Sequence, residues 1–147
     1  MDRTGNQKLS SSDIYIPVAA GTVITEAAMV AVNTDGYAVM ASKAAGQCVA
    51  GCAMGFADNT AGNAGALAVP VRRGAFVWDN DGSIKQTDIL KDAYVSDART
   101  VTITADGSSK AGKIIAVDAD GVTVEMLNGR ETATTVPAGG KDGGSEG

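Results

Sequence analysis

The sequence predicts an all-β fold, a small and mainly antiparallel barrel or sandwich of short strands with one short helical turn. The first observation is the dipeptide Asp-Gly, which occurs at Asp35-Gly36, Asp81-Gly82, Asp106-Gly107 and Asp120-Gly121. Glycine adopts the positive φ of tight hairpin turns, and an aspartate before it can hydrogen-bond its own backbone. The second observation is that short runs rich in Val, Ile, Thr and Ala flank each pair. Turns that alternate with such runs are typical of hairpin-connected strands.

The chain of 147 residues suits one domain with two extensions. Residues 1–13 are polar and show no periodicity, so we expect an N-terminal arm. Residues 14–127 carry the strand pattern and are expected to form the β-rich domain. Residues 128–147 are rich in glycine and low in hydrophobicity, so we expect a flexible tail.

In the first half of the domain, residues 14–18 alternate like an edge strand, because Pro17 cannot donate to a central ladder. The alanine-rich stretches 26–31 and 41–50 favour helix by propensity. Glycines 46, 51 and 55 oppose a long helix, so we predict a strand over residues 47–56. Further short strands are expected at residues 22–24, 29–32 and 37–41.

In the second half, residues 58–65 have the composition of a loop. Residues 67–71 and 74–78 predict two strands, or one strand bent near Pro70. The short helical turn is expected at residues 87–92, with Thr87 or Asp88 as its N-cap. Strands follow at residues 94–95, 100–104, 113–117 and 122–126, the last two joined in a hairpin around residues 119–121.

Charge and hydropathy limit the partners of the chain. The net charge of −5 disfavours non-specific binding to nucleic acid, which needs clustered Lys and Arg. Arg72-Arg73 is the one adjacent basic pair, and on a strand its side chains point to opposite faces. We expect one solvated and one salt-bridged arginine, or a contact with an acidic partner. No apolar stretch approaches the ~20 residues of a membrane span, and no secretory signal is visible, so we expect a soluble protein made in the cytoplasm.

The sequence offers few side-chain combinations suited to catalysis or metal binding. The sequence has no histidine, which rules out nucleophile-plus-histidine catalysis. Cys48 and Cys52 lack the spacing and the partners of a zinc site, and we expect two buried small hydrophobes rather than a disulfide. The acidic residues mostly flank glycine in turns, and no paired carboxylates stand in a recognisable catalytic context. We therefore expect no enzyme, no cofactor and no metal.

Two motifs imitate ligand sites. Residues 107–113 have the Gly-x4-Gly-Lys spacing of a phosphate-binding loop, but Ile114 stands where Ser or Thr would bind Mg²⁺. A β-branched run follows where that loop needs a helix, so we expect no nucleotide site. Residues 79–82 and 118–121 resemble calcium loops, yet glycine falls at the fourth position instead of the sixth. Plain turns are expected at both.

Two large aromatic side chains are candidates for a place in the core or in a subunit interface. Phe76 and Trp78 share one face of their expected strand, and they are candidates for the core or for a subunit interface, together with Arg73. The chain is otherwise rich in Ala and Gly, so each strand buries little area. Contact with further copies of the chain would bury additional apolar area.

The order of segments between residues 19 and 125 resembles a family of capsid cement (head decoration) proteins of tailed bacteriophages. The stretches that carry the resemblance are 20–24, 29–31, 36–39, Gly51 with Ala53, Asp58 to Gly62, Val69 to Val71, 73–76, 94–97, Ala111-Gly112 and 114–118. Many members carry a glycine near the position of Ala27-Ala28, and the chain after Asn128 lies outside the resemblance.

The resemblance implies a β-rich homotrimer on the outer surface of an icosahedral head, at or near three-fold positions. There it would cement neighbouring subunits of the major capsid protein and stabilise the expanded, DNA-filled shell. Ile14, Tyr15 and Ile16 are our candidates for the capsid contact, by addition of a strand to an exposed capsid edge. The alternatives are a receptor- or glycan-binding module, which needs an aromatic platform, and a small enzyme, which needs converging carboxylates.

Overall fold

The computed structural model describes residues 13–129, which form a β-protein with one 3-10 turn, η1 (Gln86–Asp88). The all-β prediction is confirmed. The strands in chain order are β1 (Asp13–Pro17), β2 (Thr22–Ile24), β3 (Met29–Val32), β4 (Ala38–Met40), β5 (Cys48–Ala53), β6 (Ala57–Asn59), β7 (Ala68–Arg72), β8 (Gly74–Asn80), β9 (Asp92–Asp97), β10 (Thr100–Thr102), β11 (Lys110–Asp118) and β12 (Gly121–Met126).

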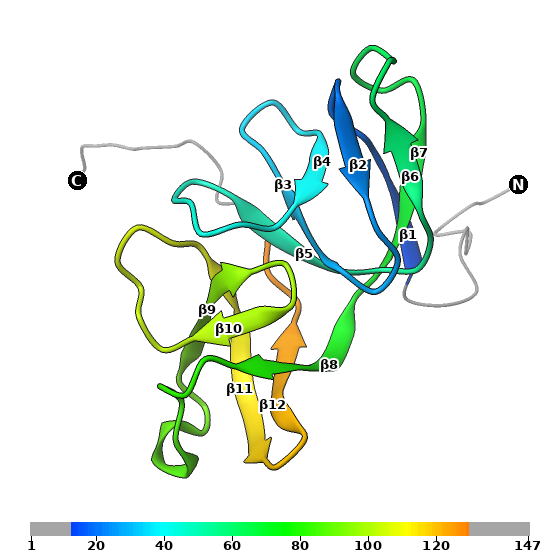
Figure 1. Cartoon of the computed structure of the whole chain (residues 1–147). Coiled ribbons are helices and arrows are strands. Elements are labelled where there is room, and N and C mark those ends of the chain that lie inside the picture. Colours follow the sequence, from blue (N-terminus) through cyan, green and yellow to red (C-terminus); the bar gives the residue numbers. More distant parts are fainter. Residues whose placement is uncertain (1–12, 130–147) are drawn as a thin grey trace, which may run out of the picture.

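The strands form two bodies that lie one above the other in Figure 1. The upper body is a sheet in the order β1-β7-β5-β3-β4, with the β2-β6 pair beside it. The lower body is a closed barrel in the order β10-β8-β12-β11-β9. All the pairings of strands are antiparallel except β10 with β8. The chain passes from sheet to barrel between β7 and β8, at Arg73.

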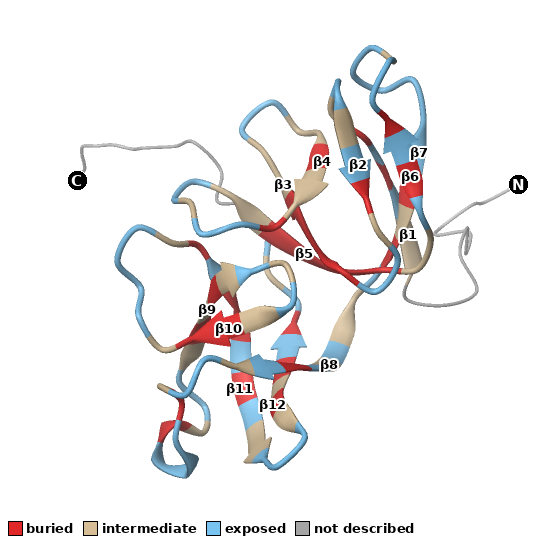
Figure 2. Ribbon diagram, viewed as in Figure 1, coloured by how far each residue is buried: buried red, intermediate tan, exposed pale blue. Residues whose placement is uncertain are grey.

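Strands β3 and β5 are buried on both faces, because the sheet lies between two hydrophobic cores (Figure 2). Met29 of β3 packs with the barrel, whereas the next residue, Val30, belongs to the second core on the other face of the sheet. In β5 the register shifts opposite Val30 and Ala31, and this bulge turns Val49 and Cys52 toward the same core. In β5, Ala50 and Ala53 belong to the second core, and Gly51 has no room for a side chain because a Cβ there would meet the backbone carbonyl of Arg72.

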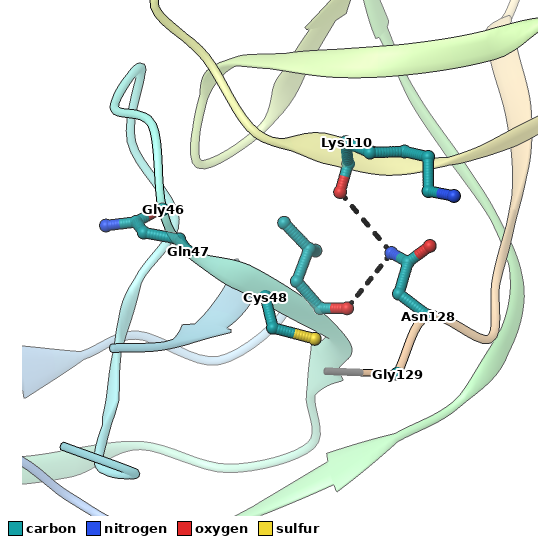
Figure 3. A pocket seen from close by; sticks show the side chains of 7 residues that line it. Gly46, Gln47, Cys48, Lys110, Asn128 and Gly129 are labelled. Atoms are coloured by element: carbon teal, nitrogen blue, oxygen red, sulfur yellow. Dashed lines mark hydrogen bonds between the residues drawn. The ribbon is translucent and has the colours of Figure 1, made fainter. Parts of the chain in front are cut away.

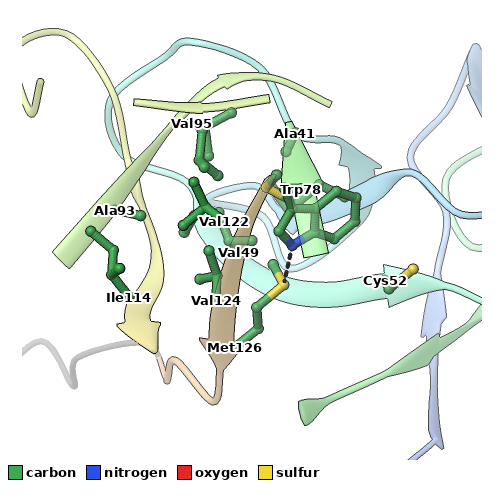
Figure 4. Close-up of a cluster of buried hydrophobic side chains, with 14 of the residues drawn as sticks. Ala41, Val49, Cys52, Trp78, Ala93, Val95, Ile114, Val122, Val124 and Met126 are labelled. Carbon is green, nitrogen blue, oxygen red and sulfur yellow. Dashed lines mark hydrogen bonds between the residues drawn. The ribbon is translucent and has the colours of Figure 1, made fainter. Parts of the chain in front are cut away.

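The barrel is closed around the larger core, which Figure 4 shows. Trp78 is buried, and its indole N–H points at the sulfur of Met126, 3.2 Å away. Phe76 packs against the same core, with its ring centroid 6.3 Å from that of Trp78. The remaining buried members from the barrel strands and their connections are Ile84, Ala93, Val95, Val101, Ala111, Ile114, Val122 and Val124.

Polar contacts hold the sheet to the barrel. The backbone N–H of Met29 donates to the carbonyl of Ala98, in the turn between β9 and β10, at 2.8 Å. The guanidinium of Arg99 in that turn lies 3.4 Å from the carbonyl oxygens of Ala27 and Glu26. On another side of the junction, the Ser109 hydroxyl donates to the carbonyl of Ala44 at 2.6 Å. The two bodies therefore share backbone bonds as well as an apolar core.

The four Asp-Gly pairs within residues 13–129 divide into two groups. Asp35-Gly36 turns β3 into β4, and Asp120-Gly121 closes the β11-β12 hairpin, as predicted. Asp81-Gly82 instead leads from β8 into η1, and Asp106-Gly107 lies in the connection from β10 to β11. These two pairs make turns without making hairpins, because strands adjacent in sequence at those points pair with other neighbours in the barrel.

Several expected boundaries were wrong. Residues 57–59 form β6, paired with β2, where we expected a loop from residue 58. The helical turn begins one residue earlier than predicted and lies at Gln86–Asp88, and residue 92 already belongs to β9. Asp88 is not its N-cap but accepts the N–H of Lys85 from inside the turn. Of the two alternatives for residues 67–78, the one with two strands is confirmed, because β7 ends at Arg72 and β8 begins at Gly74. Gly74 has a φ of 140°, which favours glycine, and Pro70 lies within β7.

Two residues other than glycine adopt positive φ: Ala27 at 70° and Leu90 at 72°. Ala27 is the third residue of a turn closed by the bond from the Ala28 N–H to the Thr25 carbonyl. Leu90 holds the same place in a turn closed from Lys91 to the Asp88 carbonyl. This place in a turn prefers glycine, since a Cβ there costs about 1–2 kcal/mol. Leu90 is also 66% exposed, so its side chain adds little packing.

We expect Ala27→Gly and Leu90→Gly to stabilise the protein. Relief of the backbone strain, about 1–2 kcal/mol, outweighs the added entropy of a glycine in the unfolded chain, about 0.5–1 kcal/mol. Urea denaturation should show each variant more stable by roughly 0.5–1 kcal/mol. Leu90→Ala is the control, because it removes the side chain and keeps the strain. Equal stability of Leu90→Gly and Leu90→Ala would contradict the explanation.

Asp88 makes the η1 turn sensitive to acid. Its carboxylate accepts the Lys85 N–H at 2.8 Å and the Lys91 ammonium at 3.1 Å. These contacts, the backbone bond first, lower the pKa of Asp88 below its ordinary 3.8. A lowered folded pKa stabilises the folded state above the ordinary value, and this contribution is lost as the pH falls through the folded pKa.

Stability measured against pH should therefore be level near neutrality and decline below about pH 4, as such carboxylates take up protons. Asp88→Asn keeps an oxygen that can accept the Lys85 N–H but does not titrate, so its acid-induced loss should be smaller. Asp106→Asn, in an exposed turn, is the matched control. Urea midpoints collected from pH 7 to pH 3 test this, and identical slopes for wild type and Asp88→Asn would refute it.

Candidate interaction site

The candidate site is the outer edge of β1. In the sheet order β1 is the outermost strand, and among residues 13–129 only β7 pairs with it over its length. Tyr15 stands opposite Pro70, which has no N–H to give. The bonded pairs to β7 are therefore those of Ile14 with Val71 and Ile16 with Val69, and the backbone N–H and C=O of Tyr15 point to the outer edge.

The side chains of the three predicted contact residues divide between core and surface. Ile16 is only 8% exposed and belongs to the second core. Ile14 is half-buried and packs against the same core. Tyr15, on the other face, is 64% exposed. Of the three, Tyr15 alone presents both its side chain and its backbone to a partner.

Apolar groups extend from Tyr15 across the sheet. Pro70 lies beside it, and a Cβ built on Gly55 would be 3.3 Å from Cγ of Pro70, so the backbone of residue 55 packs on the proline ring. The next residue, Phe56, is 63% exposed. At one end of β1 the Arg72 guanidinium binds the Asp13 carboxylate with two bonds, at 2.6 and 3.2 Å. That pair is close to neutral, so the surface around Tyr15 is mainly apolar.

Arg73, Phe76 and Trp78 lie elsewhere. Phe76 and Trp78 share the inner face of β8 and belong to the barrel core. Arg73 is half-buried, and its guanidinium donates to the backbone carbonyl of Asn128. Arg72 is the salt-bridged arginine of the pair. A subunit contact for Arg73, Phe76 or Trp78 stays a prediction.

A hollow of about 390 Å³ lies where the sheet meets the barrel (Figure 3). The side-chain amide of Asn128 lies in its wall and donates to the carbonyls of Val49 and Ala111, at 3.1 and 2.8 Å. The lining residues are Gly46, Gln47, Cys48, Val49, Lys110, Asn128 and Gly129. Asn128, which we expected to begin the tail, is therefore bound to the body of the protein.

Of the two cysteines that we expected to be buried, Cys52 is buried and Cys48 is half-buried. Cys48 and Cys52 are free thiols, and Cys52 is buried, which raises the pKa of its thiol. The bulge in β5 turns Cys52 to the face of Val49, hence opposite to Cys48. In the stretch that imitates a phosphate loop, a strand begins at Lys110. Within residues 13–129, no group of three or more His, Cys, Asp or Glu side chains gathers as a metal site would require.

The comparisons with known proteins add no relative. No protein-family model, no curated protein and no solved structure matches the chain. In the part of the chain that the structure describes, no helix has the length and apolar character needed to cross a membrane.

The geometry of the β1 edge predicts opposite effects for two neighbouring prolines. Tyr15→Pro removes an N–H that points away from β7, so the free energy of unfolding should change little. Ile14→Pro removes an N–H that bonds to β7 and also truncates a core side chain, so it should destabilise by at least about 2 kcal/mol. Urea denaturation of both variants tests the assignment. Tyr15→Pro as unstable as Ile14→Pro would show that Tyr15 faces inward.

Proposed function

We propose that the protein is a non-enzymatic capsid cement protein of a tailed bacteriophage. In this proposal a homotrimer binds the outer surface of the icosahedral head, bridges neighbouring subunits of the major capsid protein and stabilises the expanded shell. The order of segments that resembles the cement family supports it.

The observation that carries the proposal is the outer edge of β1. An edge strand with outward N–H and C=O groups can take up a further strand from a partner by backbone bonding. Natural sheets usually protect such an edge with charge, and here Pro17 and the Asp13–Arg72 pair protect the two ends only. Between them stands Tyr15, a residue type that is enriched at the centres of protein interfaces.

A trimer would multiply this contact. Three copies of one short edge bind together through high effective concentration, even where each alone is weak. Binding to the expanded shell and not to its precursor would stabilise the expanded state by mass action. Residues 1–12, which precede the candidate contact residues in the N-terminal arm, lie outside the described residues.

Co-sedimentation with expanded and unexpanded empty heads of the phage tests the proposal. We expect a trimer by sedimentation velocity that pellets with expanded heads alone. Tyr15→Pro should bind at least about tenfold more weakly, because it removes an outward N–H and the aromatic ring. Tyr15→Phe, which keeps the ring and the backbone, and Val23→Thr, at an exposed position on β2, are the matched controls.

A monomer that ignores expanded heads would refute the cement function. Binding to heads that Tyr15→Pro leaves intact would retain the function and remove the β1 edge from it. A protein that ignores heads and binds cell-surface glycans would instead support the receptor-binding alternative.

A further inference from the structure

Asn128-Gly129 is the single Asn-Gly pair of the sequence. Asn-Gly is the dipeptide most prone to deamidation, because a glycine nitrogen meets no side chain of its own on approach to the asparagine amide. A Cβ built on Gly129 would find no atom within 4 Å, so the backbone there is in open space. The hollow of Figure 3 is lined by both residues and gives water access to them. The pair thus combines the reactive sequence with room to react.

The Asn128 amide is engaged as a donor. Its Nδ2 lies 3.1 Å from the carbonyl oxygen of Val49 and 3.4 Å from that of Lys110 (Figure 3). The carbonyl oxygen of Ala111 is nearer still, at 2.8 Å. Val49 belongs to the sheet and the other two to the barrel strand β11, so one NH₂ group links both bodies. These bonds hold the amide in place against three carbonyl oxygens. Held in that way, it is not free to turn toward the Gly129 nitrogen.

We propose that Asn128 is a spontaneous deamidation site which the sheet-barrel junction protects. When the junction opens locally, the Gly129 nitrogen attacks Cγ of Asn128. The Cγ–Nδ2 bond breaks, ammonia leaves with the proton of the Gly129 amide, and a cyclic imide remains. Water then opens the ring to aspartate or isoaspartate, so the whole step consumes one water and releases one ammonia.

The product cannot restore the junction. A carboxylate at position 128 has no proton to give, and it would place negative charge against three carbonyl oxygens. A transient opening therefore becomes a permanent loss of the link between the sheet and the barrel. This inference does not depend on the proposed function, since it concerns the stability of the protein alone.

The first test compares two Asn→Asp substitutions by thermal unfolding. Asn128→Asp, which is the deamidated side chain, should lower Tm by about 5 °C or more. Asn33→Asp is the matched control, because Asn33 uses its Oδ1 as an acceptor from the N–H groups of Asp35 and Tyr37, and aspartate keeps that oxygen. Asn33→Asp should change Tm by no more than about 1 °C. If Asn128→Asp does not fold, aged wild-type protein, separated by its extra charge on anion exchange, replaces it.

The second test measures the reaction by mass spectrometry of full-length protein held in mildly alkaline buffer. Deamidation at residue 128 should be at least about tenfold slower in the folded protein than in denaturing urea. Gly129→Ala should slow it in both, and the open space at residue 129 lets this variant fold. Ser109→Ala, which loosens the junction, should speed it in the folded protein. Equal rates in buffer and in urea, or an unchanged Tm of Asn128→Asp, would overturn the proposal.

Discussion

The burial of strands β3 and β5 on both faces is the constraint on which the rest of the structure depends. One face of the sheet closes the second core, and the other packs on the barrel core. Gly51 shows how tight this arrangement is, since a Cβ there would lie 2.2 Å from the carbonyl oxygen of Arg72. Gly51 leaves room for the close approach of β5 to β7. The unfolding of one body would expose a face of the other, so we expect the two to unfold together.

Hydrogen bonds between the sheet and the barrel add directional contacts to this apolar packing. Arg99, Ser109 and Asn128 each reach from one body to backbone carbonyls of the other or of both. Buried carbonyls need donors, and Asn128 supplies one to the carbonyls of Val49 and Ala111, which are both buried residues. An apolar interface alone would permit small rotations of sheet on barrel. Hydrogen bonds from these three side chains hold the sheet and the barrel in one relative orientation.

A rigid body of this kind suits a protein that works by contact. The outward backbone of Tyr15 is set by the pairing of β1 with β7, and that pairing is in turn held by Ile14 and Ile16 in the second core. The groups offered to a partner are therefore preorganised, which limits the entropy lost on binding. Affinity would come from many copies of such an edge on a repeating surface, not from one deep pocket.

Local sequence determined much of this fold. Proline at position 17 marked β1 as an edge strand, and Asp35-Gly36 and Asp120-Gly121 fixed two hairpins, because turn chemistry acts over a few residues. The role of Asn128 and the outward direction of Tyr15 had no local signal. Asn128 meets Val49 across 79 residues, and Tyr15 faces outward because Pro70 lies opposite it. Only the tertiary structure decides such contacts, since they depend on which distant backbone groups the two cores bring together.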